Sequence, residues 1–199
     1  MARARRRLTA HDWADAALAA IGERGLAAVA VEPLAARLGT TKGSFYWHFA
    51  NRDALIAAAL GRWEEIHTEQ IITEMETEPD PERRLRRLLT KAIAAAAEDP
   101  LEVSLLATAD HPQVAAAIER VTKRRVGYVA HLFEELGFEP EEARRRGLLA
   151  YASYLGHTQL SHAVPQALPV GVERAVYLES VMDTLLRAGS PGISSPSGD

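Results

Sequence analysis

The sequence predicts an all-α protein with a small three-helix head at the N-terminus and a larger helical body behind it. Apolar residues recur three and four positions apart along most of the chain, which is the spacing of one helix face. No stretch alternates apolar and polar residues as a half-buried strand does. Glycine and proline separate the periodic segments, so we expect distinct helices joined by short turns.

Composition limits the kind of protein that this is. Apolar residues make up 47% of the chain and charged residues 25%, as in soluble globular proteins. There is no cysteine, which excludes disulfides and thiolate metal sites. No apolar run approaches the roughly 20 residues of a membrane span, and no signal-peptide core follows the basic N-terminus. We therefore expect a cytoplasmic protein that does not associate with membranes.

The first two helices have recognisable ends. Thr9 is a predicted N-cap with Asp12 three residues on, and the helix should run to residue 23 before Gly25 ends it. A second helix should start near residue 31, with Pro33 in its first turn, where a missing N–H costs little. Both helices carry an apolar stripe and belong to the head.

Residues 39–49 are the most informative stretch. They predict a helix entered through a glycine turn, with Phe45 and Phe49 on one face. The opposite face carries small, polar and aromatic residues, among them Gly43 and Trp47. Gly43 costs roughly 1 kcal/mol of helix propensity, so a close approach to that face should compensate for it. This arrangement suits a helix-turn-helix that docks in the major groove of DNA.

The motif Leu34-Ala35-x-x-Leu38-Gly39-x-x-Lys42-Gly43-Ser44-Phe45-Tyr46-x-His48-Phe49, followed by Asn51-Arg52-Asp53-x-Leu55, resembles the DNA-binding region of TetR-family transcriptional regulators. The resemblance covers about residues 9–60. It implies phosphate contacts from Lys42, Tyr46, His48 and Arg52, and a groove-facing surface from Thr41, Gly43, Ser44 and Trp47. Thr40 completes the predicted DNA-binding set. The chain departs from the family pattern at Ala30, where Thr or Ser is usual, which puts a helix cap and a phosphate contact in doubt.

Charge divides the chain in the same way. Residues 1–63 hold nine Lys and Arg against five Asp and Glu, whereas residues 64–199 hold 14 against 22. A basic head on an acidic body is typical of a DNA-reading domain joined to one that does not bind DNA. The basic arm, residues 1–8, is either a solvated tail or a segment that reaches phosphates or a minor groove.

The rest of the chain predicts a helical body. Asn51 should cap a helix that runs towards residue 75, and Pro79 and Pro81 should end it. Further helical patterns span residues 85–93, 101–109, 114–136, 141–163 and 172–188. The predicted domains are a helix-turn-helix DNA-binding domain at residues 1–50 and an effector-binding and dimerisation domain at residues 51–188. A disordered tail at residues 189–199 follows.

The last two helices are apolar on more than one side. One side can face the core of the body and leave the other for a partner, although a helix buried in a monomer would show the same pattern. Because TetR-like proteins pair through their last two helices, the resemblance favours a homodimer. The predicted interface residues are Ala152, Ser153, Gly156, Leu178, Met182 and Leu185.

The body should also hold a pocket for a small-molecule effector, as TetR-like bodies do. Aromatic and titratable side chains of the kind that line ligand sites are Trp63, Leu105, His111, Tyr128, His131, Tyr151, Tyr154 and His157. Each of these residues can instead simply pack the core. His157 and His162 are five positions apart and cannot hold one ion from the same helix face, so we expect no metal, cofactor or catalytic group.

These observations predict a DNA-binding transcriptional regulator, most simply a homodimeric repressor that a ligand releases from a near-palindromic operator. The alternatives within the class are an activator and a ligand-independent DNA-binding protein. A helical enzyme or ligand carrier with a vestigial head is the alternative from another class. Binding to double-stranded DNA at physiological salt distinguishes these classes.

Overall fold

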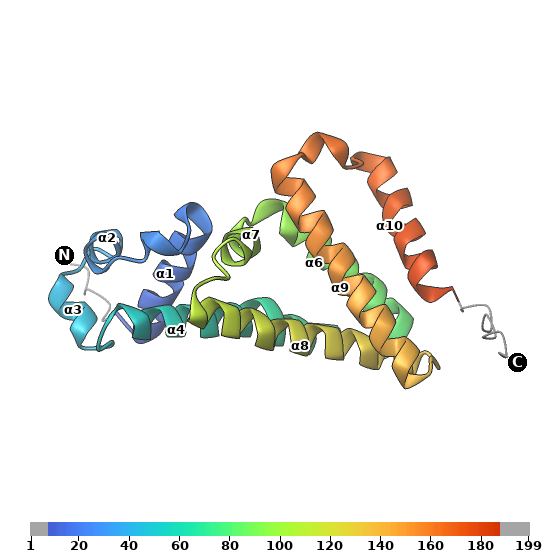
Figure 1. Ribbon diagram of the computed structural model, residues 1–199, viewed down its shortest axis with the longest axis horizontal. Helices are drawn as coiled ribbons and strands as arrows, with labels where there is room; N and C mark the ends of the chain where they lie inside the picture. The colour runs from blue at the N-terminus through green and yellow to red at the C-terminus, as the bar shows by residue number, and fades with distance from the viewer. Residues whose placement is uncertain (1–7, 188–199) are drawn as a thin grey trace, which may run out of the picture.

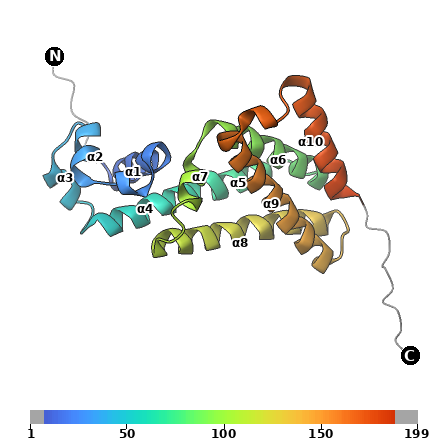
Figure 2. The same ribbon diagram turned by 45° about the horizontal axis from the view of Figure 1, so that its top comes forward.

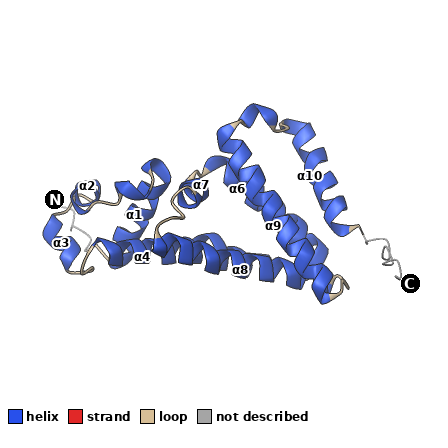
Figure 3. Cartoon of the chain, in the orientation of Figure 1, coloured by secondary structure: helices blue, strands red, loops and turns tan. Residues whose placement is uncertain are grey.

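The structure is a computed structural model that describes residues 8–187, so the predictions for most of the basic arm and for the C-terminal tail lie outside the described residues. Every regular element within residues 8–187 is helical (Figure 3). The all-α prediction is confirmed. The head lies at one end of the molecule, and the last helix lies at the other end (Figure 1).

The head begins with α1 (Ala10–Arg24), whose start is closed by a capping box. The Thr9 hydroxyl accepts a hydrogen bond from the Asp12 backbone N–H, and the Asp12 carboxylate accepts one from the Thr9 N–H at 2.7 Å. The short 3₁₀-helix η1 (Leu26–Ala28) follows, and then α2 (Val31–Arg37) and α3 (Lys42–Tyr46). The predicted helix starts at Thr9 and near residue 31 agree with these bounds.

The helix after the head contains an irregular turn that the sequence does not reveal. Asn51 caps α4 (Arg52–Glu64) by accepting a hydrogen bond from the Ala54 N–H at 2.9 Å. The helix continues as the π-helical turn η2 (Glu65–Glu69) and then as α5 (Gln70–Met75). Single π-turns are uncommon and are frequent at functional sites, and η2 contributes to the cavity described below.

The body consists of α6 (Pro81–Glu98), α7 (Leu101–Leu106), α8 (Pro112–Glu135), α9 (Pro140–Ala163), the 3₁₀-helix η3 (Pro165–Ala167) and α10 (Gly171–Leu186). Four of these helices, α6, α8, α9 and η3, begin with proline at a position where no N–H is required. α4 and α8 run side by side, whereas α10 lies at the end away from the head in both views (Figures 1 and 2).

Two apolar clusters hold the fold together. The first joins α1 to α4 and continues into α7 and the first half of α8, with Trp13, Phe45, Trp63 and Leu105 at most 2% exposed. The second lies among α5, α6, α8, α9 and α10 around the buried Phe133. Since the first cluster crosses the predicted domain boundary at residue 50, the head packs directly on the body.

A close helix crossing joins α8 and α9. A Cβ atom at Gly147 would lie 2.9 Å from the Val126 carbonyl oxygen and 3.2 Å from the Ala130 Cβ. Position 147 therefore requires glycine for the two backbones to approach this closely.

Among the described helices, none combines the length and the apolar content that crossing a bilayer requires.

Candidate DNA-binding surface and ligand cavity

The inner face of α3 anchors this helix to the head. Phe45 is fully buried and Phe49 is 8% exposed. The Phe45 ring stacks on Phe49 at a centroid distance of 5.7 Å and meets Trp13 of α1 edge-on at 5.5 Å. These aromatic contacts fix the rotation of α3 about its axis, because turning the helix would expose both phenylalanine rings.

The outer face of α3 stands clear of the other described elements. The Trp47 side chain, directly after α3, is 85% exposed, and Tyr46 is 57% exposed. Thr41, Lys42 and Gly43 are exposed as well, whereas Thr40, Ser44 and His48 are partly covered. An indole left in water at this extent is uncommon on a monomer surface unless a partner covers it. The helix faces assigned from sequence periodicity agree with the structure.

A tight turn sets the angle between α2 and α3. Gly39 has a positive φ of 63°, a conformation that glycine adopts without steric cost. The Thr40 N–H donates to the Ala35 carbonyl at 2.9 Å and the Gly39 N–H donates to the Ala36 carbonyl at 3.1 Å. These two bonds form a Schellman motif that closes the C-terminus of α2. The second helix of the pair is thereby held at a fixed angle.

Gly43 faces open space rather than the head. A Cβ atom at this position would have as its nearest neighbour the Thr41 hydroxyl, at an ordinary 3.6 Å. Nothing within residues 8–187 therefore requires glycine here. We expect the close approach that the glycine suggests to come from a molecule outside the chain.

Two predicted phosphate-binding residues have partners within the head. Lys42 forms an exposed ion pair with Glu32 at 2.9 Å, a contact that a phosphate can replace at little cost. The Arg52 guanidinium donates to the Val29 carbonyl at 2.6 Å and to the Leu26 carbonyl at 2.9 Å. Arg52 therefore ties the start of α4 to the end of η1, and this structural role differs from the predicted one.

The departure at Ala30 has the expected consequence. Ala30 is the N-cap residue of α2 and supplies no side-chain hydrogen bond. Its backbone carbonyl still accepts from the Leu34 N–H at 3.2 Å, so the helix begins at the usual place. The cap and any phosphate contact from a hydroxyl are both missing at this position.

A cavity of about 130 Å³ lies in the body where several helices converge. Its walls are predominantly apolar and come from η2, α5, α6, α7, α8 and α9. The lining residues are His67, Thr68, Ile71, Ile72, Leu88, Leu89, Lys91, Ala92, Ala95, Glu102, Arg125, Tyr128, Val129, Ala150, Tyr151 and Tyr154. A mostly apolar cavity with a few convergent polar groups is the usual form of a small-molecule site.

The polar end of the cavity is built around Arg125. Its guanidinium forms an ion pair with Glu102 of α7 at 2.8 Å and donates to the Thr68 hydroxyl at 2.9 Å and to the His67 carbonyl at 3.1 Å. The Tyr154 hydroxyl donates to Glu102 at 2.8 Å. The network thus connects η2, α7, α8 and α9.

Burial changes the protonation equilibria around this network. Burial, with the nearby Glu102 carboxylate, raises the pKa of Tyr154, so this hydroxyl keeps its proton. Burial lowers the pKa of His67, so the imidazole at the cavity wall is neutral at pH 7.

The structure brings three of the predicted pocket residues to this cavity, namely Tyr128, Tyr151 and Tyr154. Trp63 lies behind it, with its ring 5.6 Å from the Arg125 guanidinium. Leu105 packs in the first apolar cluster, and His111 is the N-cap residue of α8. His157 is buried and stacks on Tyr177 at 5.9 Å. None of these last three lines the cavity.

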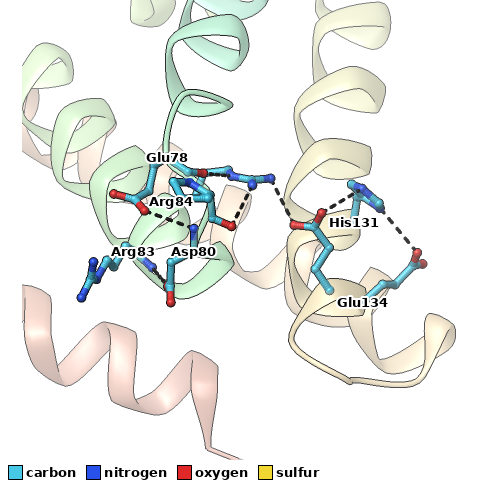
Figure 4. Close-up of polar contacts among 8 residues, drawn as sticks. Glu78, Asp80, Arg83, Arg84, His131 and Glu134 are labelled. Atoms are coloured by element: carbon cyan, nitrogen blue, oxygen red, sulfur yellow. Dashed lines mark hydrogen bonds and ion pairs between the residues drawn. The ribbon is translucent and has the colours of Figure 1, made fainter.

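His131, another predicted pocket residue, does not line the cavity either. Its side chain is 62% exposed and lies within 3.9 Å of the carboxylates of Glu134 and Glu135 on its own helix. Figure 4 shows His131 next to Glu134 and near Arg84 of α6. Arg84 forms an ion pair with Glu135 at 3.1 Å. His131 therefore belongs to a surface charge cluster and not to the cavity.

The last two helices present an apolar surface, but not with all of the predicted residues. Ala152, Ser153 and Gly156 are exposed on α9, as the interface prediction requires. Met182 and Leu185 are at most 4% exposed and pack in the second core, and Leu178 is partly covered. The inward position of Met182 and Leu185 corrects the prediction. The exposed apolar residues of this region are Leu148, Leu149, Leu160, Val164, Val170, Val172, Val176 and Tyr177.

Sequence reasoning missed Arg125 and Glu102, the buried ion pair at the polar end of the cavity. Arg125 follows Val121 by four positions and precedes Val129 by four, so it occupies a position on the buried stripe of α8. Glu102 stands between the buried Leu101 and the buried Leu105. Charged residues at core positions require a partner, and this signal was available in the sequence.

Among the described residues, no group of three or more His, Asp or Glu side chains is arranged to hold a metal ion.

The fold and the surface of α3 define a helix-turn-helix DNA-binding head on an all-helical body. Residues 14–59 match the family described as "Bacterial regulatory proteins, tetR family". Over 76 residues the chain is 37% identical to the HTH-type transcriptional regulator TtgR of Pseudomonas putida. That match covers 38% of this chain and 36% of TtgR. The predicted resemblance to TetR-family regulators is confirmed in the DNA-binding region.

Solved structures extend the likeness in fold to about nine-tenths of the chain. A transcriptional regulator from Rhodococcus sp. Rha1 has a TM-score of 0.70 at 21% identity, over 90% of this chain and 94% of that chain. The transcriptional regulator FadR from Bacillus subtilis, solved in complex with stearoyl-CoA, has a TM-score of 0.65 at 16% identity, over 89% of this chain and 98% of that chain. At these identities the likeness shows the shared fold.

Proposed function

We propose that this chain is a DNA-binding transcriptional regulator that acts in the cytoplasm as a homodimer. More specifically, we propose a repressor that leaves a near-palindromic operator when a small molecule binds in the body. The outer face of α3 carries the proposal: Trp47 and Tyr46 stand in solvent while Phe45 holds the helix from behind. A helix presented in this way fits the major groove, where polar and aromatic side chains reach base edges.

The position of the cavity supports control by a ligand. Glu102 at the cavity wall belongs to α7, and its neighbours Leu101 and Leu105 pack in the same core as α1. The Ser104 hydroxyl donates to the Gly22 carbonyl of α1 at 3.3 Å. A ligand that moves Glu102 therefore moves a helix that contacts the head directly. We expect this displacement to change the orientation of α3 relative to the body.

The exposed apolar residues of α9 and α10 support a dimer. Leu149, Ser153, Gly156 and Leu160 follow one another at three and four positions and so share one face of α9. Small residues between leucines allow a second helix to approach closely. In a dimer, two heads would bind successive major grooves only when their separation is near one helical turn, about 34–36 Å. A ligand that alters this separation would release the DNA.

Selection of DNA from a random pool by the pure protein tests the proposal. We expect a near-palindromic sequence to be enriched and to bind far more tightly than random DNA at physiological salt. Light scattering of the same preparation should give the mass of a dimer. A chain that enriches no sequence, but binds or converts a small molecule, would contradict the proposal and indicate a helical carrier or enzyme.

A further inference from the structure

The charges at the polar end of the cavity are already matched by the protein itself. Arg125 and Glu102 are only 14% and 10% exposed in their side chains and form a close ion pair. Arg125 also lies over the Trp63 and Tyr154 rings, at 5.6 and 5.9 Å from their centroids. Its cationic group therefore has both a carboxylate and aromatic faces as partners.

This arrangement disfavours a charged ligand of either sign. A cationic ligand that reached the Glu102 carboxylate would lie beside the Arg125 charge, which repels it. An anionic ligand would need the guanidinium, which Glu102 already neutralises, and it would meet the Glu102 charge in a buried setting. An anion would find no unpaired cation, and a cation would have to approach the Arg125 charge, so either ion is costly to bury.

Lys91, the lysine of the cavity wall, is also paired. It forms an ion pair with Glu74 of α5, and Arg87 pairs with the same carboxylate at 2.9 Å. These groups are about 40% exposed and lie towards solvent. Within the described part of the chain, they therefore supply no unpaired positive charge to the cavity.

One hydrogen-bonding position at the polar end is open. The Glu102 Oε2 atom accepts from Arg125 and from the Tyr154 hydroxyl, whereas Oε1 accepts from Arg125 alone among the described residues. Since a carboxylate oxygen can accept two hydrogen bonds, Oε1 has room for one more donor. A neutral hydroxyl group satisfies this position without adding charge.

The volume of the cavity limits the size of the ligand. At about 130 Å³ it is close to an apolar cavity of ~150 Å³ in another protein that binds benzene. We infer that the effector is an uncharged, largely apolar molecule about the size of one substituted aromatic ring, with a hydroxyl group that donates to Glu102. This inference rests on the proposed function. A longer acyl chain would fit in the cavity only if the cavity walls moved apart.

A panel of four molecules of matched size tests this inference. The probes are 4-ethylphenol, ethylbenzene, 4-ethylbenzoate and 4-ethylbenzylammonium, measured by calorimetry and thermal shift on the intact protein at pH 7. We expect 4-ethylphenol to bind at least about tenfold more tightly than either ion, and more tightly than ethylbenzene. Equal or tighter binding of 4-ethylbenzoate, or no binding of 4-ethylphenol at millimolar concentration, would overturn the inference.

Glu102→Gln should reverse the charge preference. The variant leaves the buried Arg125 without its carboxylate, so 4-ethylbenzoate should now bind more tightly than 4-ethylphenol. Glu69→Gln is the matched control, because it removes the carboxylate partner of Arg124, a residue outside the cavity lining, and should leave the order of the four probes unchanged. A folded Glu102→Gln variant that still prefers the phenol would contradict the inference. If that variant does not fold, the order of the probes on the native protein decides.

Failure of the inference and failure of the proposed function give different results. If 4-ethylphenol binds but leaves the affinity for selected DNA unchanged, the cavity chemistry stands and ligand-controlled repression fails. If an ionic ligand binds in the cavity and releases the DNA, repression stands and the neutral ligand class is wrong.

Discussion

Gly147 of α9 lies so close to Ala130 of α8 that a Cβ atom on Gly147 would be 3.0 Å from the Ala130 backbone nitrogen. Gly147→Ala should therefore destabilise the protein by about 1–3 kcal/mol, because the added methyl group must push two long helices apart. Urea unfolding measures this change. Gly127→Ala on α8 is the matched control, since no heavy atom lies within 4 Å of its Cβ position, and it should instead stabilise by up to about 1 kcal/mol. Equal effects of the two variants would contradict the close crossing.

Gly43→Ala should separate stability from DNA binding. The helix gains roughly 1 kcal/mol of propensity, and the head offers no steric obstacle to the methyl group. The melting temperature should rise while the affinity for selected DNA falls, because the methyl group meets the nucleic acid. Gly61→Ala on α4 has equally open surroundings and should raise the melting temperature without changing DNA affinity. Unchanged DNA affinity in Gly43→Ala would place the DNA elsewhere.

Trp47→Ala should impair recognition and leave the fold intact. The side chain is 85% exposed, so its removal creates no cavity. We expect a loss of about 1–3 kcal/mol in binding to selected DNA and relaxed preference at one or two base pairs. Phe45→Ala is the internal comparison: its fully buried ring should cost about 3–5 kcal/mol of stability. If the effects of the two variants were exchanged, α3 would have to present its opposite face to the DNA.

Val176→Arg should dissociate the proposed dimer. Val176 is 65% exposed on α10, and a charged side chain there would be buried at the interface without a partner. Light scattering at micromolar concentration should change from the mass of a dimer to that of a monomer, with an unchanged helical spectrum. Ala116→Arg on the exposed surface of α8 adds the same charge away from α10 and should remain dimeric. A dimer in both variants would remove α10 from the interface.

The partly buried His67 and the buried His157 should make the fold less stable in mild acid. Burial lowers the pKa of His67 and of His157 below the usual 6.5, and Arg174 adds to the effect at His157. The unfolded chain therefore binds more protons, so stability should fall as pH decreases from about 6.5 towards the lowered values. Urea unfolding at pH 8 and pH 5.5 measures the difference. His157→Phe keeps a ring against Tyr177 and should reduce the dependence; an unchanged dependence would exclude His157 as a source.

Local signals were sufficient to predict most of the fold. Thr9 with Asp12, and Asn51, mark helix starts through caps that need no distant contact, and Pro79 and Pro81 mark the end of the helix before α6. The inward and outward faces of α3 followed from the spacing of its aromatic residues. These features are set within a few residues of each other, which is why a sequence pattern reveals them.

The cavity could not be predicted in the same way, because its chemistry depends on contacts between distant segments. Arg125 reaches Thr68 and the His67 carbonyl across 57 and 58 positions in the chain. The π-turn that carries these partners has an ordinary helical sequence. Met182 was misplaced for a related reason: when a helix is apolar on several sides, periodicity does not say which side meets the core.

The core that runs from α1 through α4 into α7 and α8 also has a consequence for how the protein unfolds. Leu55, Ile56 and Leu60 cover the same cluster that buries Trp13, so a fragment that ends at residue 50 would expose most of that cluster to water. The predicted boundary at residue 50 would thus not divide the chain into independent folding units. We expect the chain to unfold in one cooperative transition. The backbone amides of α1 and α8 should therefore exchange with solvent at similarly slow rates. If the head alone were joined to another body, it would lose the side chains that cover this cluster and would not keep its fold.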